Sequence, residues 1–176
     1  LGVEHDGYGL VTLHRPENVD DPKRLIGIMA ELEKLAETQP LCFPVHPRTQ
    51  KLLDQIGWRP SEPRTALQLL GPLPYINFMS LLLTAKFVVT DSGGLQEETS
   101  YLGVDCFTLR DTTERPVTVT HGTNKLVTLD NMISTIRQRD LYDLRRGAPP
   151  IDLWDGKAAT RVVAALRDFI ADMPRS

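Results

Sequence analysis

The sequence is poor in cysteine, in aromatic residues and in net charge. Its 176 residues include only two cysteines, 6% aromatic residues and a formal net charge of −3. Cys42 and Cys106 both lie in apolar runs typical of buried strands. We therefore interpret each as a small core residue in a reducing cytoplasm, with neither a disulfide nor a metal site. The charge excludes a broad basic surface for nucleic acid, so any bound anion must be held locally by a few donors.

The sequence also lacks long apolar runs, so it does not predict a membrane-spanning segment. No stretch approaches the length of a membrane span, and no signal peptide opens the chain. The chain begins at Leu1 without a methionine, and residues 1–7 are interpreted as the remnant of a linker between two domains. A trimmed natural terminus is the alternative. Residues 8–176 suit one domain with a hydrophobic core.

Short apolar runs alternate with segments of helical periodicity along the whole chain. Asp21 is expected to cap a helix that begins at Pro22, because its apolar residues recur at helical spacing. Continuous apolar strands between helices are typical of a parallel sheet covered on both faces. The fold class is therefore predicted as α/β, with a Rossmann-like doubly wound sheet of about six strands. The predicted strands are 8–13, 41–45, 66–70, 87–90, 105–109 and 125–127.

Four further segments are predicted to be helical. Residues from about 49 to 56 and 95–102 form short helices, whereas 75–85 is apolar nearly all round and is expected to be well buried. Apolar residues between 159 and 170 recur at helical spacing and predict a packed terminal helix. Pro44 lacks the N–H that a strand ladder needs, so its strand is expected to be interrupted or near an edge.

Polar clusters follow five of the predicted strands. Doubly wound sheets bind ligands beyond the carboxyl ends of their strands, so these clusters should meet at one edge. We call this edge the strand-end rim and expect a binding site there. Its segments are 14–18, 46–49, 71–74, 91–94 and 110–115.

The most informative rim segment is Ser92-Gly93-Gly94, which opens a helix. Two glycines let backbone N–H groups converge on one point, and the helix dipole favours an anion there, so this turn can hold a phosphate. Glu98, one helical turn later, can reach ribose hydroxyls. The alternative is a plain tight turn with Glu98 on a solvated helix face, and placement on the rim favours the phosphate site.

Histidine and arginine side chains supply the other candidate groups. His14 can exchange protons near neutral pH and Arg15 can pair with a phosphate, although a histidine at a strand end can also simply bond backbone. Arg115 could neutralise a leaving diphosphate, and Glu114 could orient that arginine or meet a sugar hydroxyl. A surface ion pair is the alternative for these two. His46 and Arg48 could contact the sugar or an allosteric ligand. The alternative is that they only stabilise the structure of the rim.

Four segments occur in fixed order along the chain: residues 14–18 (HRPEN), 44–47 (PVHP), 90–98 (TDSGGLQEE) and 110–116 (RDTTERP). Together they resemble the C-terminal domain of non-hydrolysing UDP-N-acetylglucosamine 2-epimerases, over nearly the whole chain from about Tyr8. The resemblance implies half of a two-domain GT-B-like enzyme that interconverts UDP-N-acetylglucosamine and UDP-N-acetylmannosamine. In that family UDP leaves by anti elimination and adds again after the configuration at C2 has changed. No metal or redox cofactor is implied.

The resemblance also assigns roles. It implies diphosphate contacts at Ser92, Gly93 and Gly94, a ribose contact at Glu98, and uracil contacts in the loop from Leu73 to Tyr75. His14 would lie beside the diphosphate and sugar, with Arg115 also facing the site. The family's acid and base carboxylates belong mainly to the N-terminal domain. The chain alone is therefore expected to bind UDP weakly and to be inactive, and the full-length protein to be a homodimer.

Two departures and several alternatives leave the function open. Val117 follows Arg115-Pro116 where the family usually has an acidic residue, and Thr120-His121-Gly122 replaces a more usual stretch. Both put sugar specificity and allosteric contacts in doubt. A hydrolysing 2-epimerase, a GT-B glycosyltransferase domain and a non-catalytic nucleotide-sugar-binding module remain as alternatives.

Overall fold

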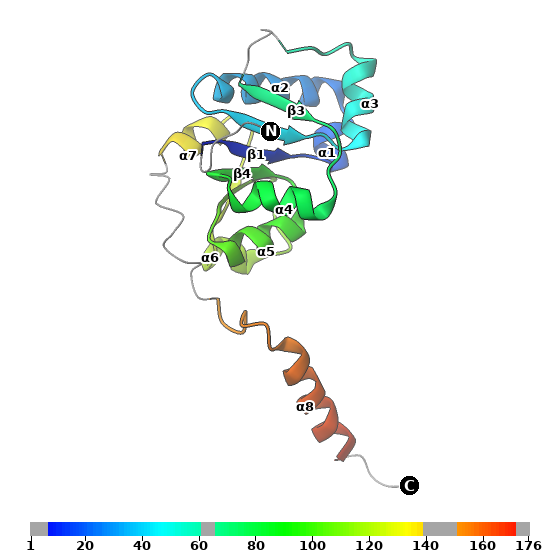
Figure 1. Cartoon of the computed structure of the whole chain (residues 1–176), viewed down its shortest axis with the longest axis vertical. Coiled ribbons are helices and arrows are strands. Elements are labelled where there is room, and N and C mark those ends of the chain that lie inside the picture. The colour runs from blue at the N-terminus through cyan, green and yellow to red at the C-terminus, as the bar shows by residue number, and fades with distance from the viewer. Residues whose placement is uncertain (1–6, 61–65, 139–150, 172–176) are drawn as a thin grey trace.

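In the computed structural model, residues 7–60, 66–138 and 151–171 are described. Six parallel strands form one sheet in the order β3-β2-β1-β4-β5-β6 (Figure 1). This order reverses between β1 and β4, which is the arrangement of a doubly wound sheet. The predicted fold class is therefore confirmed. The strands are β1 (Gly9–Thr12), β2 (Leu41–Pro44), β3 (Leu67–Leu70), β4 (Phe87–Thr90), β5 (Asp105–Leu109) and β6 (Asn124–Val127).

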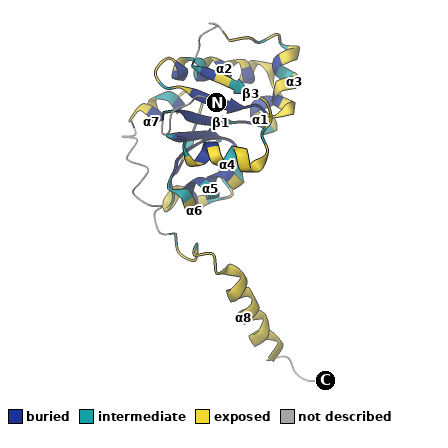
Figure 2. Ribbon diagram, in the orientation of Figure 1, coloured by how far each residue is buried: buried dark blue, intermediate teal, exposed yellow. Residues whose placement is uncertain are grey.

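Helices cover both faces of the sheet, and each face has its own buried core. One core includes Leu25, Leu53 and Ile136, from α2, α3 and α7, packed on strand residues such as Val11. The other includes Leu82 of α4 with Leu95 of α5. Figure 2 shows the sheet between these layers as buried. The helices are α1 (Pro16–Val19), α2 (Pro22–Ala36), α3 (Pro47–Gln55), α4 (Tyr75–Leu83), α5 (Gly93–Leu102), α6 (Pro116–Thr120), α7 (Met132–Gln138) and α8 (Ala158–Ala171).

Local sequence signals place several elements correctly. The Asp21 side chain caps α2 by accepting from the Lys23 N–H at 3.0 Å. Cys42 and Cys106 are buried free thiols, as predicted, and burial raises the pKa of the Cys42 thiol. Gly9 allows close packing between strands, since a Cβ there would lie 2.4 Å from Phe87 Cζ.

One expectation about packing is confirmed: the strand that holds Pro44 is interrupted and lies near an edge. β2 pairs with the edge strand β3 as far as Pro44, whereas its pairing with β1 ends at Cys42. Two other expectations about packing are wrong. Helix α4 buries only Leu81 and Leu82, and Ile76 is 73% exposed. Its apolar composition therefore does not reflect burial on all sides.

The second wrong expectation is that the terminal helix α8 packs. None of its residues is buried, and Phe169 is 65% exposed. Figure 1 shows α8 extending away from the sheet, and Figure 2 shows it exposed along its length. Helical spacing of apolar residues predicts that a helix has a packing face, but it does not say which surface will cover that face.

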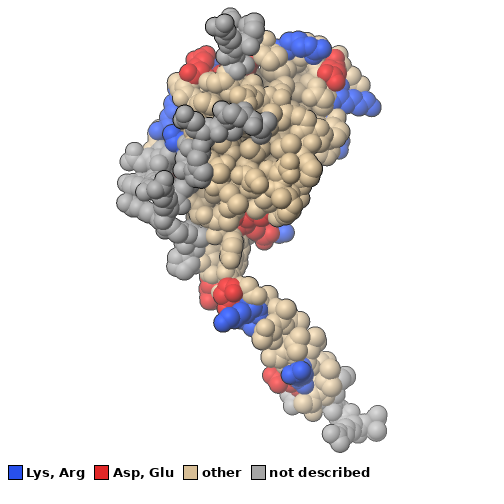
Figure 3. All heavy atoms as spheres, in the orientation of Figure 1, with Lys and Arg blue, Asp and Glu red and all other residues tan. Residues whose placement is uncertain are grey.

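Surface charge is mixed in sign. On the face shown in Figure 3, Lys and Arg side chains alternate with Asp and Glu around the margins, and no basic field forms. Among the described residues, no helix has the length and apolar content needed to cross a membrane.

Candidate functional site

The strand-end rim brings the loop after β1 against the turn after β4, where the strand order reverses. Asp91, fully buried at the end of β4, makes this junction. Its carboxylate accepts the backbone N–H of Arg15 at 2.9 Å and that of His14 at 3.1 Å. The side-chain amide of Asn18 donates to it at 3.2 Å. A ligand-binding crevice is expected at this reversal in doubly wound sheets.

Sequence reasoning assigned no role to Asp91, although it belongs to the segment that carried the resemblance. A buried carboxylate is costly unless donors surround it, so an acidic residue closing an apolar strand was the available signal. Asn18 was likewise given no role of its own from the sequence. It is buried, and it also donates to the Leu109 carbonyl at 3.1 Å, which ties the loop to β5.

The Ser92-Gly93-Gly94 turn forms the N-terminus of α5. Ser92 is the N-cap residue, and its side chain makes no capping hydrogen bond. The first N–H groups of a helix have no partner within the helix, so they remain available to an anion together with the helix dipole. A Cβ added to Gly93 would lie 3.8 Å from both Arg15 Nη2 and Glu114 Oε2. Gly93 therefore borders a space that the side chains of Arg15 and Glu114 also line.

Glu114 is held by arginines, though not by the one expected. Arg110 donates from both terminal nitrogens to Glu114, at 2.8 and 2.9 Å, and Arg15 Nη2 lies 3.8 Å from it. The hydrogen bonds from Arg110 lower the pKa of Glu114 to about 2. A carboxylate with this pKa stays charged at neutral pH, which suits electrostatic positioning better than proton transfer.

Arg115 has a different partner from the one predicted. The expectation that Glu114 orients it is wrong, because Arg115 Nε lies 2.9 Å from Glu97 Oε1 on α5. Its backbone N–H donates to Thr113 Oγ1 at 2.9 Å, which anchors the start of α6. The half-exposed guanidinium thus lies beside α5.

A buried polar network fixes this loop against α5. Gln96 Oε1 accepts from Thr113 Oγ1 and, at 3.0 Å, from Asn124 Nδ2. Asn124 also donates to Thr118 Oγ1 and accepts from Thr108 Oγ1. Sequence periodicity gave no sign of this network, because its members lie on five separate segments.

Tyr75 and Glu98, predicted to contact uracil and ribose, lie next to each other. The Tyr75 hydroxyl donates to Glu98 Oε1 at 3.3 Å, and the negative charge of Glu98 raises the pKa of Tyr75. Tyr75 is exposed at the start of α4, while Leu73 packs on the core beneath. These residues form the side of the rim next to Ser92.

His46 and Arg48 lie on the opposite side of the rim from Tyr75, at the start of α3. The His46 ring centroid lies 6.0 Å from that of His14, so the structure brings these two candidates together. The Arg48 guanidinium forms a two-contact ion pair with Asp20. That pairing fits the alternative in which Arg48 holds the rim.

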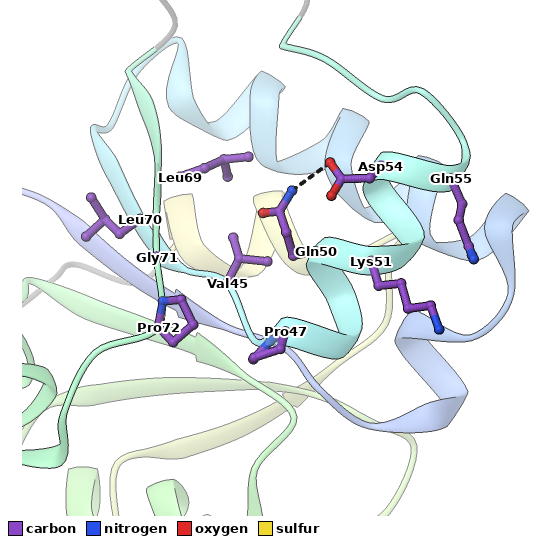
Figure 4. A pocket seen from close by; sticks show the side chains of 10 residues that line it. All are labelled: Val45, Pro47, Gln50, Lys51, Asp54, Gln55, Leu69, Leu70, Gly71 and Pro72. Carbon is purple, nitrogen blue, oxygen red and sulfur yellow. Dashed lines mark hydrogen bonds between the residues drawn. The ribbon is translucent and has the colours of Figure 1, made fainter.

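A pocket of about 760 Å³ lies between α3 and β3 (Figure 4). Gln50 and Asp54, which are hydrogen-bonded at 3.0 Å, line it together with Leu69 and Pro72. Pro47, Gly71 and Pro72 belong to the rim, but none of Ser92, Gly93 and Gly94 lines this pocket. We therefore place the candidate site at the Ser92-Gly93-Gly94 turn and not in this pocket. Among the described residues, no group of His, Cys, Asp or Glu has the arrangement of a metal site.

The sheet order and the glycine turn that opens α5 define a doubly wound, Rossmann-like α/β domain. Comparison with known proteins makes the class specific. The UDP-N-acetylglucosamine 2-epimerase family model matches residues 2–167, and the chain belongs to this family. The earlier resemblance is thereby confirmed.

Individual relatives share only part of their length with this chain. It is 37% identical over 167 residues to a UDP-N-acetylglucosamine 2-epimerase of Methanocaldococcus jannaschii, covering 93% of this chain and 45% of that protein. A crystal structure of an enzyme with that name from the same organism, in complex with UDP-GlcNAc and UDP, superposes with a TM-score of 0.79 at 36% identity. This match covers 93% of this chain and 46% of that one.

A second relative differs in its named substrate. The chain is 40% identical over 126 residues to a UDP-2,3-diacetamido-2,3-dideoxy-D-glucuronate 2-epimerase of Pseudomonas aeruginosa, covering 71% of this chain and 34% of that protein. The chain thus spans less than half the length of the relatives it matches.

Proposed function

We propose that this chain is the UDP-binding half of a 2-epimerase acting on a UDP-N-acetylhexosamine, with UDP-N-acetylglucosamine and UDP-N-acetylmannosamine as the interconverted pair. The observation that carries the proposal is the junction of Arg15, Gly93 and Glu114 at the N-terminus of α5. Helix N–H groups and a guanidinium converge there on one space, as a diphosphate requires.

The proposed chemistry divides between leaving-group stabilisation and proton transfer. When UDP is eliminated, negative charge develops on the departing diphosphate. Preorganised hydrogen-bond donors around the diphosphate stabilise that charge in the transition state. Arg15 and the α5 N-terminus supply these donors, and Ser92 adds a hydroxyl. Glu98 and Tyr75 would meet the ribose and uracil. The charged Glu114 holds Arg110 and faces Arg15, so its role in this scheme is to position guanidinium groups.

The proton-transfer groups of the reaction are proposed to come largely from a second domain. Two observations support an absent half: the relatives are about twice as long as this chain, and the apolar side of α8 is uncovered. On this proposal residues 1–7 lead in from that domain, residues 8–176 form the UDP-binding domain, and the isolated chain binds UDP without catalysing epimerisation. The complete protein would be a cytoplasmic homodimer.

The sugar has a second candidate. The similarity to the diacetamido-glucuronate 2-epimerase favours a related substrate with the same reaction at C2. Both candidates share UDP and an N-acetyl group at C2, so the UDP site described above serves either. Competition by the two UDP-sugars for the UDP site would rank them.

Calorimetric titration of this chain with UDP tests the proposal. Binding should be measurable in the unmodified chain and should disappear in a Gly93→Val, Glu98→Ala double variant. Glu31→Ala, which removes a carboxylate paired with Lys34 on α2 and away from the rim, is the matched control and should bind normally. Equal binding by the double variant would place UDP elsewhere and overturn the assignment. Epimerisation by the chain alone would refute the half-enzyme proposal.

A further inference from the structure

Two histidines lie side by side at the ends of neighbouring strands. His14 follows β1 and His46 follows β2, with ring centroids 6.0 Å apart and an interplanar angle of 41°. A neutral imidazole carries its proton on Nδ1 or on Nε2, and the partner of one nitrogen decides the state of the other. The two rings differ in what their Nδ1 atoms contact.

The Nδ1 atom of His14 lies 3.3 Å from Asp91 Oδ1. This carboxylate already receives two backbone N–H groups and the Asn18 amide, an environment that suits a charged acceptor. A lone pair on Nδ1 would face a negative oxygen and be repelled, whereas an Nδ1–H bond is attracted to it. Asp91 therefore favours the Nδ1–H tautomer of His14, which leaves a lone pair on Nε2.

The Nδ1 atom of His46 has the opposite role. His46 is the N-cap residue of α3, and its Nδ1 accepts the backbone N–H of Arg48 at 3.2 Å. A nitrogen that accepts a hydrogen bond must carry a lone pair, so the proton of the neutral ring is on Nε2. The cap thus makes Nε2 of His46 a donor.

We propose that His14 and His46 hold opposite neutral tautomers, so that their Nε2 atoms offer one acceptor and one donor at the strand-end rim. Within the described residues, no protein group hydrogen-bonds either Nε2. The pair matches a ligand that places a donor beside an acceptor, as the acetamido group of an N-acetylated sugar does. That last match rests on the proposed function, while the tautomers do not. Asp91 acts here as a positioning residue.

Long-range ¹H–¹⁵N NMR of the ¹⁵N-labelled chain tests this directly, because it reports which ring nitrogen is protonated. At a pH where both rings are neutral, His14 should show the Nδ1–H pattern and His46 the Nε2–H pattern. His14→Gln and His46→Gln variants assign the signals. An Nε2–H pattern or an unbiased mixture at His14 would overturn the inference, and so would an Nδ1–H pattern at His46.

An Asp91→Asn variant tests the cause. The His14 tautomer should lose its Nδ1–H preference while His46 keeps its pattern, with the amide spectrum showing that the variant is folded. Retention of the Nδ1–H tautomer would show that Asp91 does not set it. If this variant does not fold, the unmodified chain still decides the tautomers. Failure to bind UDP would contradict the proposed function and leave the tautomers standing, so the two ideas can fail separately.

Discussion

Arg110 and Glu114 form a two-point hydrogen-bonded pair, in which both terminal nitrogens of the guanidinium donate to both carboxylate oxygens at 2.8 and 2.9 Å. The pair closes the loop after β5 and sets Glu114 against Arg15. Because the carboxylate accepts in its charged form, the pairing lowers the pKa of Glu114 from 4.5 to about 2 and raises that of Arg110. The pairing also fixes the position of the negatively charged Glu114 carboxylate beside the Ser92-Gly93-Gly94 turn.

Glu114 should stay ionised to far lower pH than an ordinary glutamate. Its pKa is lower in the folded than in the unfolded state, so the pairing contributes its full stability above pH 4.5 and loses it as pH falls towards about 2. Carboxyl ¹³C NMR titration of the chain measures this directly. An Arg110→Gln variant should return the Glu114 pKa towards 4.5. An ordinary value in the unmodified chain would refute the pairing.

Gly93→Ala should weaken UDP binding without weakening the fold. The added Cβ meets no protein atom closer than 3.8 Å, but it enters the space lined by Arg15 and Glu114 where the diphosphate is proposed to lie. Glu31→Ala, which alters a residue of α2 away from the proposed diphosphate site, is the control. Thermal melting should show both variants as stable as the unmodified chain, and calorimetry should show a loss of affinity larger for Gly93→Ala. Equal affinities would place the anion elsewhere.

Thr118→Val should destabilise the chain by about 1–3 kcal/mol, because it deprives buried polar groups of a partner. The fully buried Thr118 Oγ1 donates to the Arg115 carbonyl at 2.7 Å and accepts from Asn124 Nδ2 at 3.1 Å. Thr120→Val in the same helix removes only an exposed hydroxyl and should cost less than about 0.5 kcal/mol. Urea unfolding measures both. Similar losses in the two variants would mean that the buried network contributes nothing specific.

Gly9→Ala should cost about 1–3 kcal/mol through overpacking in the centre of the sheet. Its Cβ would approach the Phe87 ring at 2.4 Å and Leu41 Cδ2 at 2.8 Å, and both side chains are fully buried. Gly71→Ala, with nothing within 4 Å of the added Cβ, is the control and should leave the free energy of unfolding nearly unchanged. An unaltered unfolding midpoint for Gly9→Ala would show that β1 and β4 can separate without loss.

Local signals along the chain predict the order of the strands and longer helices and the edge of the sheet at which polar residues gather. Apolar runs and caps such as Asp21 are local signals, and parallel strands place their carboxyl ends at one edge whatever their order. For this reason Ser92, Gly93 and His14 could be chosen as site candidates from the sequence. Short helices such as α1, which begins at Pro16, escaped prediction because four residues carry too little periodicity.

The partner that each polar group takes depends on how the strand ends are placed in space. Glu114 is adjacent in sequence to Arg115, yet it pairs with Arg110, because the turn after β5 directs the two side chains apart. Asp91 and His14 meet across 77 positions of sequence, since β1 and β4 are neighbours where the strand order reverses. Hydrogen bonds and ion pairs depend on distances of a few ångströms between strand ends, and sequence spacing does not specify those distances.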